Sequence, residues 1–404
     1  MYRIARTLLI VSVSLLVVYG LSMLYSTTYT AWGETLLQKQ VIWIALGSVL
    51  ALICSELLDY HFLGRHSYLL IFMFIAMLSY LGLINVISHF SLLPEDIIEL
   101  APFVGGLSKG SARWFNFGYF SVQPSEFAKL AIVIFMANYF MRHARHTDEF
   151  IRGFFKPLST VGVLIFLILA GGDFSTTAII GTVVFALAFV SGIRIRYLVL
   201  VVLGGLLVAT TAIVTNPERI SRITAYTHPE KYQQDESYQL WYSQLALGSG
   251  GWTGMGFTES RMKHFYLPEA HTDFIVAIIG EEVGFLGILF LMLLYIILLI
   301  SAFWIAFLAI DREGTILAIG LGLTLGFHAF VNLSVVSGFC PTTGVTAPFV
   351  SYGGSNMIAS MVSVGLMLNI CRIAEKKAKE EEMNTPQARK REPLYKQRLN
   401  LKNH

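Results

Sequence analysis

About ten long runs of apolar residues constrain the fold of this chain more than any other feature of its sequence. A helix needs about 20 apolar residues, with a range of roughly 17–25, to cross the hydrocarbon core of a bilayer. Only 14% of the 404 residues are charged, whereas a soluble protein carries about 25%. The sequence therefore predicts an all-α, polytopic membrane protein with about ten transmembrane helices. The predicted spans cover residues 8–24, 41–57, 68–86, 127–141, 158–170, 176–192, 197–214, 274–308, 316–336 and 355–373.

Basic residues in the short connections indicate the orientation, because Lys and Arg gather in cytoplasmic loops. They precede the first predicted span, lie between the fourth and fifth and between the sixth and seventh, and follow the eighth. With ten spans these positions all fall on one side, so both termini are expected in the cytoplasm. The membrane domain then covers residues 1–373, and residues 374–404 form a charged, flexible cytoplasmic tail.

Two long loops face the opposite, extracytoplasmic side in this topology, at about residues 87–126 and 215–272. Long ordered loops commonly carry function. The second loop, between the seventh and eighth helices, mixes aromatic and polar residues, as expected at the level of lipid head groups. The sequence contains no Walker, Rossmann or zinc motif, and its net charge of +3 does not indicate nucleic acid binding. A nucleotide cofactor therefore has no support.

The densest group of titratable residues lies where the second long loop meets the eighth span. It contains Asp273, with Glu269 and His271 beside it as candidate substrate-binding residues. Glu281 and Glu282 follow about two turns into the helix, and at least one is expected to face a polar cavity. Asp273 could simply cap the helix, but a cap does not need so many titratable neighbours at a membrane boundary. Its carboxylate could act as a general base or hold a divalent cation that bridges diphosphate oxygens.

A second group of candidate substrate-binding residues combines Arg113 with Glu126 and Lys129, near the start of the fourth span. Pro124 beside Glu126 is typical of a helix start. Lys129 follows Glu126 by three residues, on the same helical face and inside the apolar region, where a lysine needs a partner. The pair either fixes helix packing only, or lets Lys129 help to hold a pyrophosphate group.

Residues 341–356 contain too many prolines and glycines for a straight spanning helix. Irregular backbone is tolerated at membrane depth only where protein or a water-filled cavity covers it. The Gly-Gly-Ser run that ends at Ser355 could offer N–H groups to an anion, but a plain turn before a helix is the more common explanation of such a run. Ser351 and Ser355 are candidate substrate-binding residues. Asp173, after two glycines, is most simply a turn former.

These blocks, in their order and spacing, resemble the shape, elongation, division and sporulation family, whose branches are FtsW, RodA and SpoVE. The resemblance extends from the first span to about Arg372, and the division branch, FtsW, is the more similar one. The sequence departs from the family pattern at Gly172 and Ser175, where the family usually has proline and glycine. The strongest blocks are residues 123–130, 267–284 and 347–355.

The resemblance implies a peptidoglycan glycosyltransferase of the bacterial cytoplasmic membrane, which polymerises lipid II into glycan strands at the outer membrane face during cell division. It places the family's essential aspartate on Asp273, its glutamate and lysine on Glu126 and Lys129, and its arginine on Arg113. The implied partners are a class B penicillin-binding protein acting as transpeptidase, other division proteins and membrane lipids. We expect a divalent cation, Mg²⁺ or Mn²⁺, and no nucleotide. Two alternative functions are a lipid II flippase and a non-catalytic scaffold of the division complex.

Overall fold

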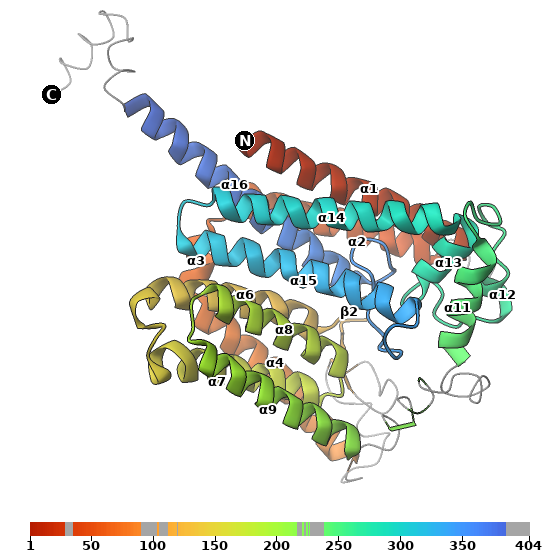
Figure 1. Cartoon of the computed structure of the whole chain (residues 1–404), viewed down its shortest axis with the longest axis horizontal. Coiled ribbons are helices and arrows are strands. Elements are labelled where there is room, and N and C mark those ends of the chain that lie inside the picture. Colours follow the sequence, from red (N-terminus) through yellow and green to blue (C-terminus); the bar gives the residue numbers. More distant parts are fainter. Residues whose placement is uncertain are drawn as a thin grey trace, which may run out of the picture.

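The computed structural model describes residues 1–28, 35–89, 103–104, 112–118, 120–215, 220, 221, 224, 226 and 238–384. Long helices run side by side in one bundle, and the start of the first helix lies at the same end as the close of the last (Figure 1). We call this end the terminal end and the opposite end the distal end. The helices are α1 (Tyr2–Thr28), α2 (Thr35–Glu56), α3 (Tyr60–Arg65), α4 (Ser67–His89), α6 (Pro124–Arg142), α7 (Lys156–Ala170), α8 (Phe174–Val190), α9 (Ile195–Val214), α11 (Tyr238–Gly250), α12 (Met262–Phe265), α13 (Ile275–Glu282), α14 (Gly284–Leu308), α15 (Arg312–Val336) and α16 (Gly354–Asn384), with a 3₁₀ turn at Ala144–His146 and a π-helical turn at Phe150–Phe155.

The predicted all-α membrane fold is confirmed. Eight helices of the described chain are long and apolar enough to cross a bilayer. α8 is a shorter apolar helix, and α6 carries Glu126 and Lys129 inside its apolar sequence. Both run within the bundle beside the longer helices (Figure 1). α6 lies deepest, since nearly every residue from its start to Phe140 is buried.

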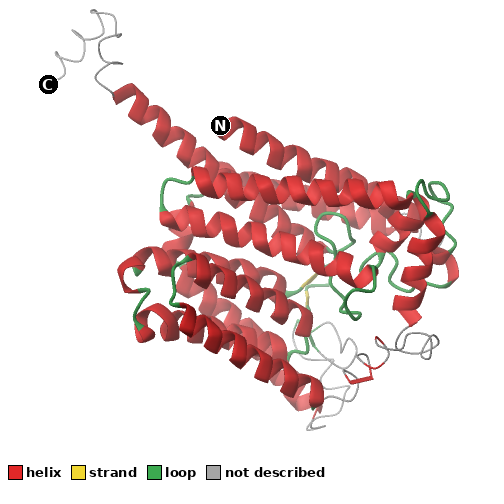
Figure 2. Ribbon diagram, viewed as in Figure 1, coloured by secondary structure: helices red, strands yellow, loops and turns green. Residues whose placement is uncertain are grey.

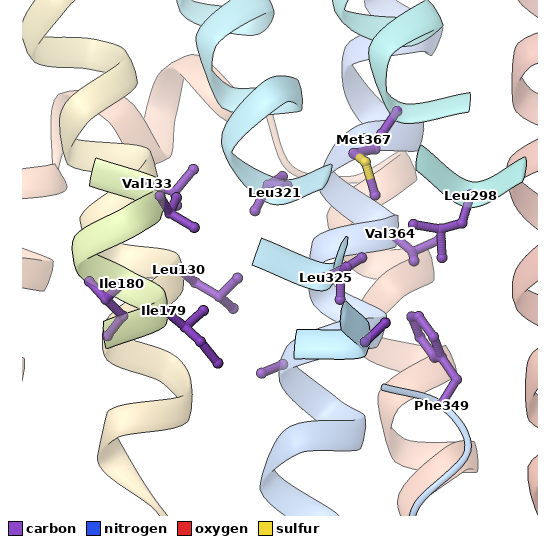
Figure 3. Packing of buried hydrophobic residues seen from close by; sticks show 14 of the residues in the cluster. Leu130, Val133, Ile179, Ile180, Leu298, Leu321, Leu325, Phe349, Val364 and Met367 are labelled. Carbon is purple, nitrogen blue, oxygen red and sulfur yellow. The ribbon is translucent and has the colours of Figure 1, made fainter. Parts of the chain in front are cut away.

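The core lies where α6, α8, α14, α15 and α16 meet (Figure 3). Leucine, isoleucine and valine side chains of these helices interdigitate there, and Phe349 closes the distal side of the cluster from a loop. Close-packed apolar side chains hold the helices in one register, because adding or removing even one methylene group disturbs the packing of such a core. The polar groups described below are therefore held on a rigid frame.

The eighth predicted span, residues 274–308, consists of two helices. α13 ends before Val283, and α14 begins at Gly284, whose φ of +76° is left-handed. Glycine suits this position because it has no Cβ to strain the turn. The span therefore bends at Gly284, which leaves α13 as a short helix that packs against α11 at the distal end (Figure 1).

A break inside a span exposes main-chain N–H and C=O groups that a continuous helix would pair. Leaving such a group unpaired in hydrocarbon costs several kcal/mol. The turn at residues 250–256 pairs them on both sides of the break, so this part of the second long loop completes the eighth span. The hydrogen bonds join Met255 N to Glu281 O (2.9 Å), Gly256 N to Glu282 O (3.1 Å), Phe285 N to Gly251 O (2.9 Å) and Leu286 N to Trp252 O (3.2 Å).

The two long loops are described only in part. In the first, β1 (Phe115–Asn116) and β2 (Ser121–Val122) form a short antiparallel ribbon just before α6. The second contributes α11 and α12. The other residues of these loops that the ranges above omit, Gly110 and Ser111 among them, lie outside the described residues.

α16 continues past residue 373, where the last span was predicted to end. Residues 374–384 are helical, although they were expected to begin a flexible tail. Glu375 explains the extension, because it pairs with Lys379 one turn later at 2.8 Å and lies 3.8 Å from Arg3 of α1. Pairs of this i,i+4 kind stabilise a helix by about 0.2–0.5 kcal/mol each. Residues 385–404 lie outside the described residues.

Replacing Gly284 by alanine tests the broken span. A Cβ at this position would lie 2.3 Å from the main-chain nitrogen of Gly254, and the left-handed backbone alone costs about 1–2 kcal/mol. We expect Gly284→Ala to lower the thermal unfolding temperature of the detergent-purified protein by several degrees. Gly82→Ala in α4 is the control, since a Cβ there meets nothing within 4 Å. Equal unfolding temperatures for the two variants would contradict the assignment of the break.

Candidate functional site

Asp273 lies in the turn at residues 268–274 that leads into α13. Loops gather at this distal end of the bundle (Figure 2). This turn, the Asp273 turn, is held through its main chain from two directions. The Tyr352 N–H donates to the His271 carbonyl at 3.0 Å, and Asn332 Nδ2 of α15 donates to the Asp273 carbonyl at 2.8 Å. The next residue, Phe274, is buried. The position of the half-buried Asp273 side chain is therefore set by groups on other elements.

The irregular loop at residues 338–353 approaches the Asp273 carboxylate. Gly344 has a φ of +71°, and a Cβ there would lie only 3.5 Å from Asp273 Oδ2. Thr343 Oγ1 and Asn332 Oδ1, which belong to the same region, are buried and lack a hydrogen-bond partner within the described chain. A buried polar atom without a partner costs about 1–3 kcal/mol. These two oxygens therefore mark a place where water, a cation or a substrate hydroxyl would be stabilised.

Glu126 and Lys129 form the predicted pair, with Lys129 Nζ 2.8 Å from Glu126 Oε2 and both side chains almost fully buried. Lys129 Nζ also lies 2.8 Å from Nε2 of His328 on α15. His328 is buried, and its Nδ1 has no partner within the described residues. One face of α6 thus carries a charged group that is tied to α15.

α15 connects this buried pair to the Asp273 turn. His328 and Asn332 lie four residues apart, so they share one face of the helix, about 6 Å from each other. One contacts Lys129 and the other contacts Asp273. A small cavity of about 10 Å³, close to the minimum for one water molecule, opens beside Lys129. Its polar lining is formed by Glu126, Lys129, Thr324, His328, Asn356, Ser360 and Ser363.

Arg113 lies on the side of α7 and α8. Its Nε donates to the Gly171 carbonyl at 3.0 Å. A guanidinium carries five N–H donors, so this contact leaves capacity for an anion. Asp173 caps α8 through the Thr176 N–H at 3.1 Å and also accepts from the Gln123 side chain at 3.2 Å. The turn-forming role expected for Asp173 is confirmed, despite the departures from the family pattern around it.

Ser351 and Ser355 make contacts within the protein. Ser351 Oγ accepts from the Ala347 N–H at 2.9 Å, inside its own loop. Ser355 Oγ accepts from the Gln123 N–H at 2.9 Å and so joins the start of α16 to the start of α6. Both contacts stabilise the loop, and substrate binding by these serines stays a prediction.

Glu269 and His271 border the Asp273 turn. Glu269 adopts a left-handed φ of +59°, accepts from Thr272 Oγ1 at 2.9 Å and lies 4.0 Å from His271 Nε2. Burial lowers the pKa of His271, and the nearby Glu269 carboxylate only partly opposes this effect. The neutral imidazole is therefore favoured at neutral pH, which suits an orienting residue more than a cation.

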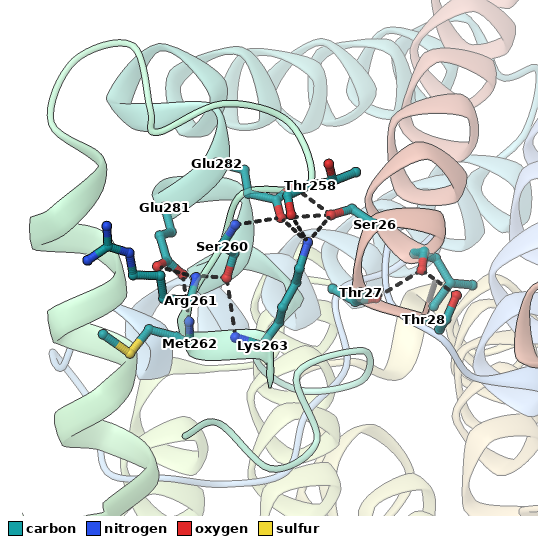
Figure 4. Close-up of polar contacts among 11 residues, drawn as sticks. Ser26, Thr27, Thr28, Thr258, Ser260, Arg261, Met262, Lys263, Glu281 and Glu282 are labelled. Carbon is teal, nitrogen blue, oxygen red and sulfur yellow. Dashed lines mark hydrogen bonds and ion pairs between the residues drawn. The ribbon is translucent and has the colours of Figure 1, made fainter. Parts of the chain in front are cut away.

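Glu281 and Glu282 do not line the cavity beside Lys129. Both are fully buried, against the segment that precedes the Asp273 turn (Figure 4). Lys263 Nζ lies 2.7 Å from Glu282 Oε1, and the Glu281 carboxylate accepts from the Ser260 hydroxyl and from main-chain N–H groups. At least one of these glutamates was expected to face a polar cavity. Instead, both are buried in a cluster of ionic and hydrogen-bonding partners.

Three residues of this region were missed from the sequence: His328, Asn332 and Lys263. His328 and Asn332 are, besides Thr324 and Ser334, the polar residues in the distal half of a largely apolar span, and polar side chains at such depth are themselves a signal of function. Lys263 gave no comparable signal, because its partners lie on α1 and α13 and no local spacing connects them.

The bundle, its buried charged pair and its carboxylate-bearing turn define a multi-pass membrane protein with a polar site at one end. The family model of the cell cycle proteins FtsW, RodA and SpoVE matches residues 2–376. The chain belongs to this family.

Curated relatives cover most of the chain. It is 39% identical over 278 residues to the probable peptidoglycan glycosyltransferase FtsW of Geobacter sp. (strain M18), covering 68% of this chain and 75% of that protein. It is 34% identical over 378 residues to the probable FtsW of Aliivibrio salmonicida, covering 87% and 94%. It is 35% identical over 367 residues to stage V sporulation protein E of Bacillus subtilis, covering 91% and 95%.

Solved structures share the fold. A chain from a peptidoglycan synthase complex that coordinates polymerization and crosslinking superposes with a TM-score of 0.72 at 26% identity, covering 91% of this chain and 97% of that one. The rod shape determining protein RodA of Thermus thermophilus superposes with a TM-score of 0.63 at 26% identity, covering 90% and 95%.

A double-mutant cycle on Glu126 and Lys129 separates packing from substrate binding. Removing one partner of a buried pair leaves an unpaired charge and costs about 3–5 kcal/mol. We expect Lys129→Met and Glu126→Gln each to destabilise the protein by that amount in thermal or denaturant unfolding, and the double variant to cost much less than their sum. Glu56→Gln, at the more exposed pair with Arg372, is the control and costs less than about 1 kcal/mol. Single variants that keep wild-type stability but lose activity would instead assign the pair to the substrate.

The lowered pKa of His271 predicts that the local stability of the Asp273 turn depends on pH. Since its folded pKa is lowered, its contribution to stability is present above about pH 6.5, the unfolded value, and is lost as pH falls through the folded pKa. We expect the protection factors of the amides of residues 268–274, which correct for the intrinsic pH dependence of hydrogen exchange, to fall on acidification, and His271→Gln to flatten that dependence. His146→Gln, near the terminal end, is the control. A pH dependence unchanged by His271→Gln would show that another group controls the turn.

Proposed function

We infer that this chain is a peptidoglycan glycosyltransferase of the FtsW type, which polymerises lipid II. The observation that carries the proposal is the Asp273 turn, which holds a carboxylate beside buried, unpartnered oxygens at the distal end of a bundle from this family. Curated relatives that are 39% and 34% identical to this chain are named probable peptidoglycan glycosyltransferases.

The reaction we propose is an inverting glycosyl transfer. The 4-hydroxyl of a lipid II sugar attacks the anomeric carbon of a growing chain. The new glycosidic bond forms as the bond to undecaprenyl diphosphate breaks, and the diphosphate leaves with the bonding electron pair. Asp273 takes the proton of the attacking hydroxyl, a role that contributes about 100- to 10,000-fold in rate. No nucleotide is required, because the lipid-linked diphosphate is already activated.

Charge on the diphosphate must be offset as it leaves. Arg113 has guanidinium donors beyond its bond to Gly171, and Lys129 has three donors, of which Glu126 and His328 take two. Both are supported as anion-binding groups by this spare capacity. The apolar isoprenoid chains would lie between helices and lipid. α9 suits such contacts, because Leu198 is its one buried residue in the structure described here.

The residues around Asp273 could supply part of the ligand set of a divalent cation, with the substrate's phosphates supplying the rest. Mg²⁺ is commonly held by one or two carboxylates together with substrate phosphates, and it keeps several waters. The described residues contain no cluster of three or more His, Cys, Asp or Glu side chains that could form a complete metal cage. Asp273, with the free oxygen of Asn332, offers a hard-oxygen donor set, so the cation would arrive with the diphosphate. There it would neutralise phosphate charge.

The chain is a multi-pass membrane protein, and it shares its fold with a chain of a peptidoglycan synthase complex. We propose the bacterial cytoplasmic membrane as its location, with both termini in the cytoplasm and Asp273 outside. The basic residues of the short connections support this orientation. A class B penicillin-binding protein is the transpeptidase partner that we propose, together with other division proteins.

The flippase alternative needs a polar path through the bundle. α6 carries only apolar residues from Leu130 to Ala137, and all of them are buried. Polar groups on this helix are thereby separated into a distal set at Glu126 and Lys129 and a terminal set at Asn138. A scaffold would not need the unpartnered oxygens beside Asp273. Both features favour the enzyme.

Replacing Asp273 by asparagine tests the catalytic role. The amide keeps the shape but cannot accept the proton, so we expect the rate of glycan polymerisation by purified protein to fall by about 100-fold or more. Products are resolved by length after incubation with lipid II and Mg²⁺. Asp148→Asn, an exposed carboxylate near the terminal end, is the control and keeps wild-type activity. Normal polymer from Asp273→Asn would remove this residue from the reaction, and lipid II movement without polymer would favour the flippase.

Removing divalent ions tests the cation separately. A chelator should lower polymerisation at least tenfold, because diphosphate charge is then unscreened, and added Mg²⁺ or Mn²⁺ should restore it. Manganese binding followed by electron paramagnetic resonance should require both lipid II and Asp273. Full activity in the chelator would exclude the cation and leave the base role.

A further inference from the structure

A buried ion pair lies at the base of the loop that carries Asp273. Lys263 and Glu282 have side chains that are 2% and 0% exposed, with Nζ and Oε1 2.7 Å apart. Asp273 lies about midway between them in the sequence, so the pair closes a loop whose tip is the Asp273 turn. We call this closure the neck. Figure 4 shows Lys263 directed toward Glu282 and Ser26, with Glu281 on the other side of Ser260.

The neck joins three parts of the chain. Ser26, near the end of α1, donates to Glu282 at 2.7 Å and accepts from Lys263 Nζ at 2.9 Å. The Glu281 carboxylate accepts from the main-chain N–H of Arg261 at 2.9 Å. The segment before the Asp273 turn is thus fastened by its main chain as well as by its lysine. These contacts set the distance and register between residues 260–263 and the end of α13.

The ion pair is poorly explained by stability alone. Two well-packed apolar side chains commonly stabilise a protein as much as a buried ion pair, because burying charges costs solvation energy. Lys263 also binds the carbonyl of Thr258 at 2.7 Å, and Thr258 holds a left-handed φ of +70° that β-branched residues avoid. Strained backbone of this kind gathers at functional sites and persists only where the surroundings fix it.

We propose that Lys263 and Glu282 are positioning residues for glycosyl transfer: their pairing across the neck, anchored on Ser26 of α1, sets where the Asp273 carboxylate meets the lipid-linked substrate. The inference rests on the proposed function, since it assigns Asp273 the reacting role. Neither residue touches the substrate. An error of about 1 Å in the placement of a reacting group can reduce a rate about 100-fold, so opening the neck should lower kcat far more than it raises KM.

The test compares Lys263→Met, Glu282→Gln and the apolar double variant Lys263→Met/Glu282→Met in the full-length protein. Initial rates of polymerisation are measured over a range of lipid II concentrations, and hydrogen exchange of residues 255–275 is measured on the same samples. Lys379→Met, at the exposed pair with Glu375, is the matched control. We expect each single variant to lose at least tenfold in kcat with KM within about threefold of wild type, and to exchange faster across residues 258–274.

The double variant decides between positioning and chemistry. If the neck acts by placement, apolar packing should restore slow exchange and bring kcat to within about fivefold of wild type. Restored exchange without restored kcat would overturn the proposal, because a charge would then be required for the reaction itself. Single variants with wild-type kcat and exchange would overturn it as well.

A protein that makes no polymer even as wild type would refute the proposed function, and the exchange data then decide on the neck alone. Faster exchange at the Asp273 turn in the single variants, with Lys379→Met unchanged, supports the neck. Exchange equal to wild type in all variants overturns it.

Discussion

The requirement that main-chain polar groups be paired at membrane depth governs the distal end of this protein. The eighth span breaks at Gly284, and the groups released there are paired by the turn at residues 250–256. A loop that looks peripheral in the sequence is thereby built into the span. Because Asp273 sits one short helix before the break, the pairing that completes the span also fixes the height of the carboxylate.

α15 connects the two polar parts of the site. Its face with His328 and Asn332 connects the buried charge of Lys129 to the main chain of the Asp273 turn. The charged pair on α6 and the carboxylate at the distal mouth are therefore parts of one polar system inside an apolar bundle. Charge stabilisation and proton transfer can be supplied from two neighbouring positions, as a reaction that releases a diphosphate needs.

The sequence predicted the parts of this structure that depend on local spacing. Apolar runs indicated the spans, and an i,i+3 relation indicated the pairing of Glu126 with Lys129. Contacts between residues far apart in the sequence were not predictable. Lys263 donates a hydrogen bond to Ser26, which lies 237 residues earlier, and nothing near either residue in the sequence indicates this contact. The same limit explains why at least one of Glu281 and Glu282 was expected to face a cavity. A glutamate that is buried against hydrogen-bond partners and a glutamate that faces water look alike in the sequence. α16 continues beyond the end of its apolar run because ion pairs at the surface stabilise the additional turns.

The central claim is that the Asp273 carboxylate meets a lipid-borne sugar diphosphate at the mouth of the bundle. An experimental structure of the full chain with a non-hydrolysable lipid II analogue tests this most directly. The account predicts an acceptor sugar hydroxyl within about 2.6–3.2 Å of the Asp273 carboxylate, or joined to it through one bound cation, with the diphosphate on the side of Arg113 and Lys129. An analogue bound elsewhere, with Asp273 remote from every sugar and phosphate oxygen, would contradict it.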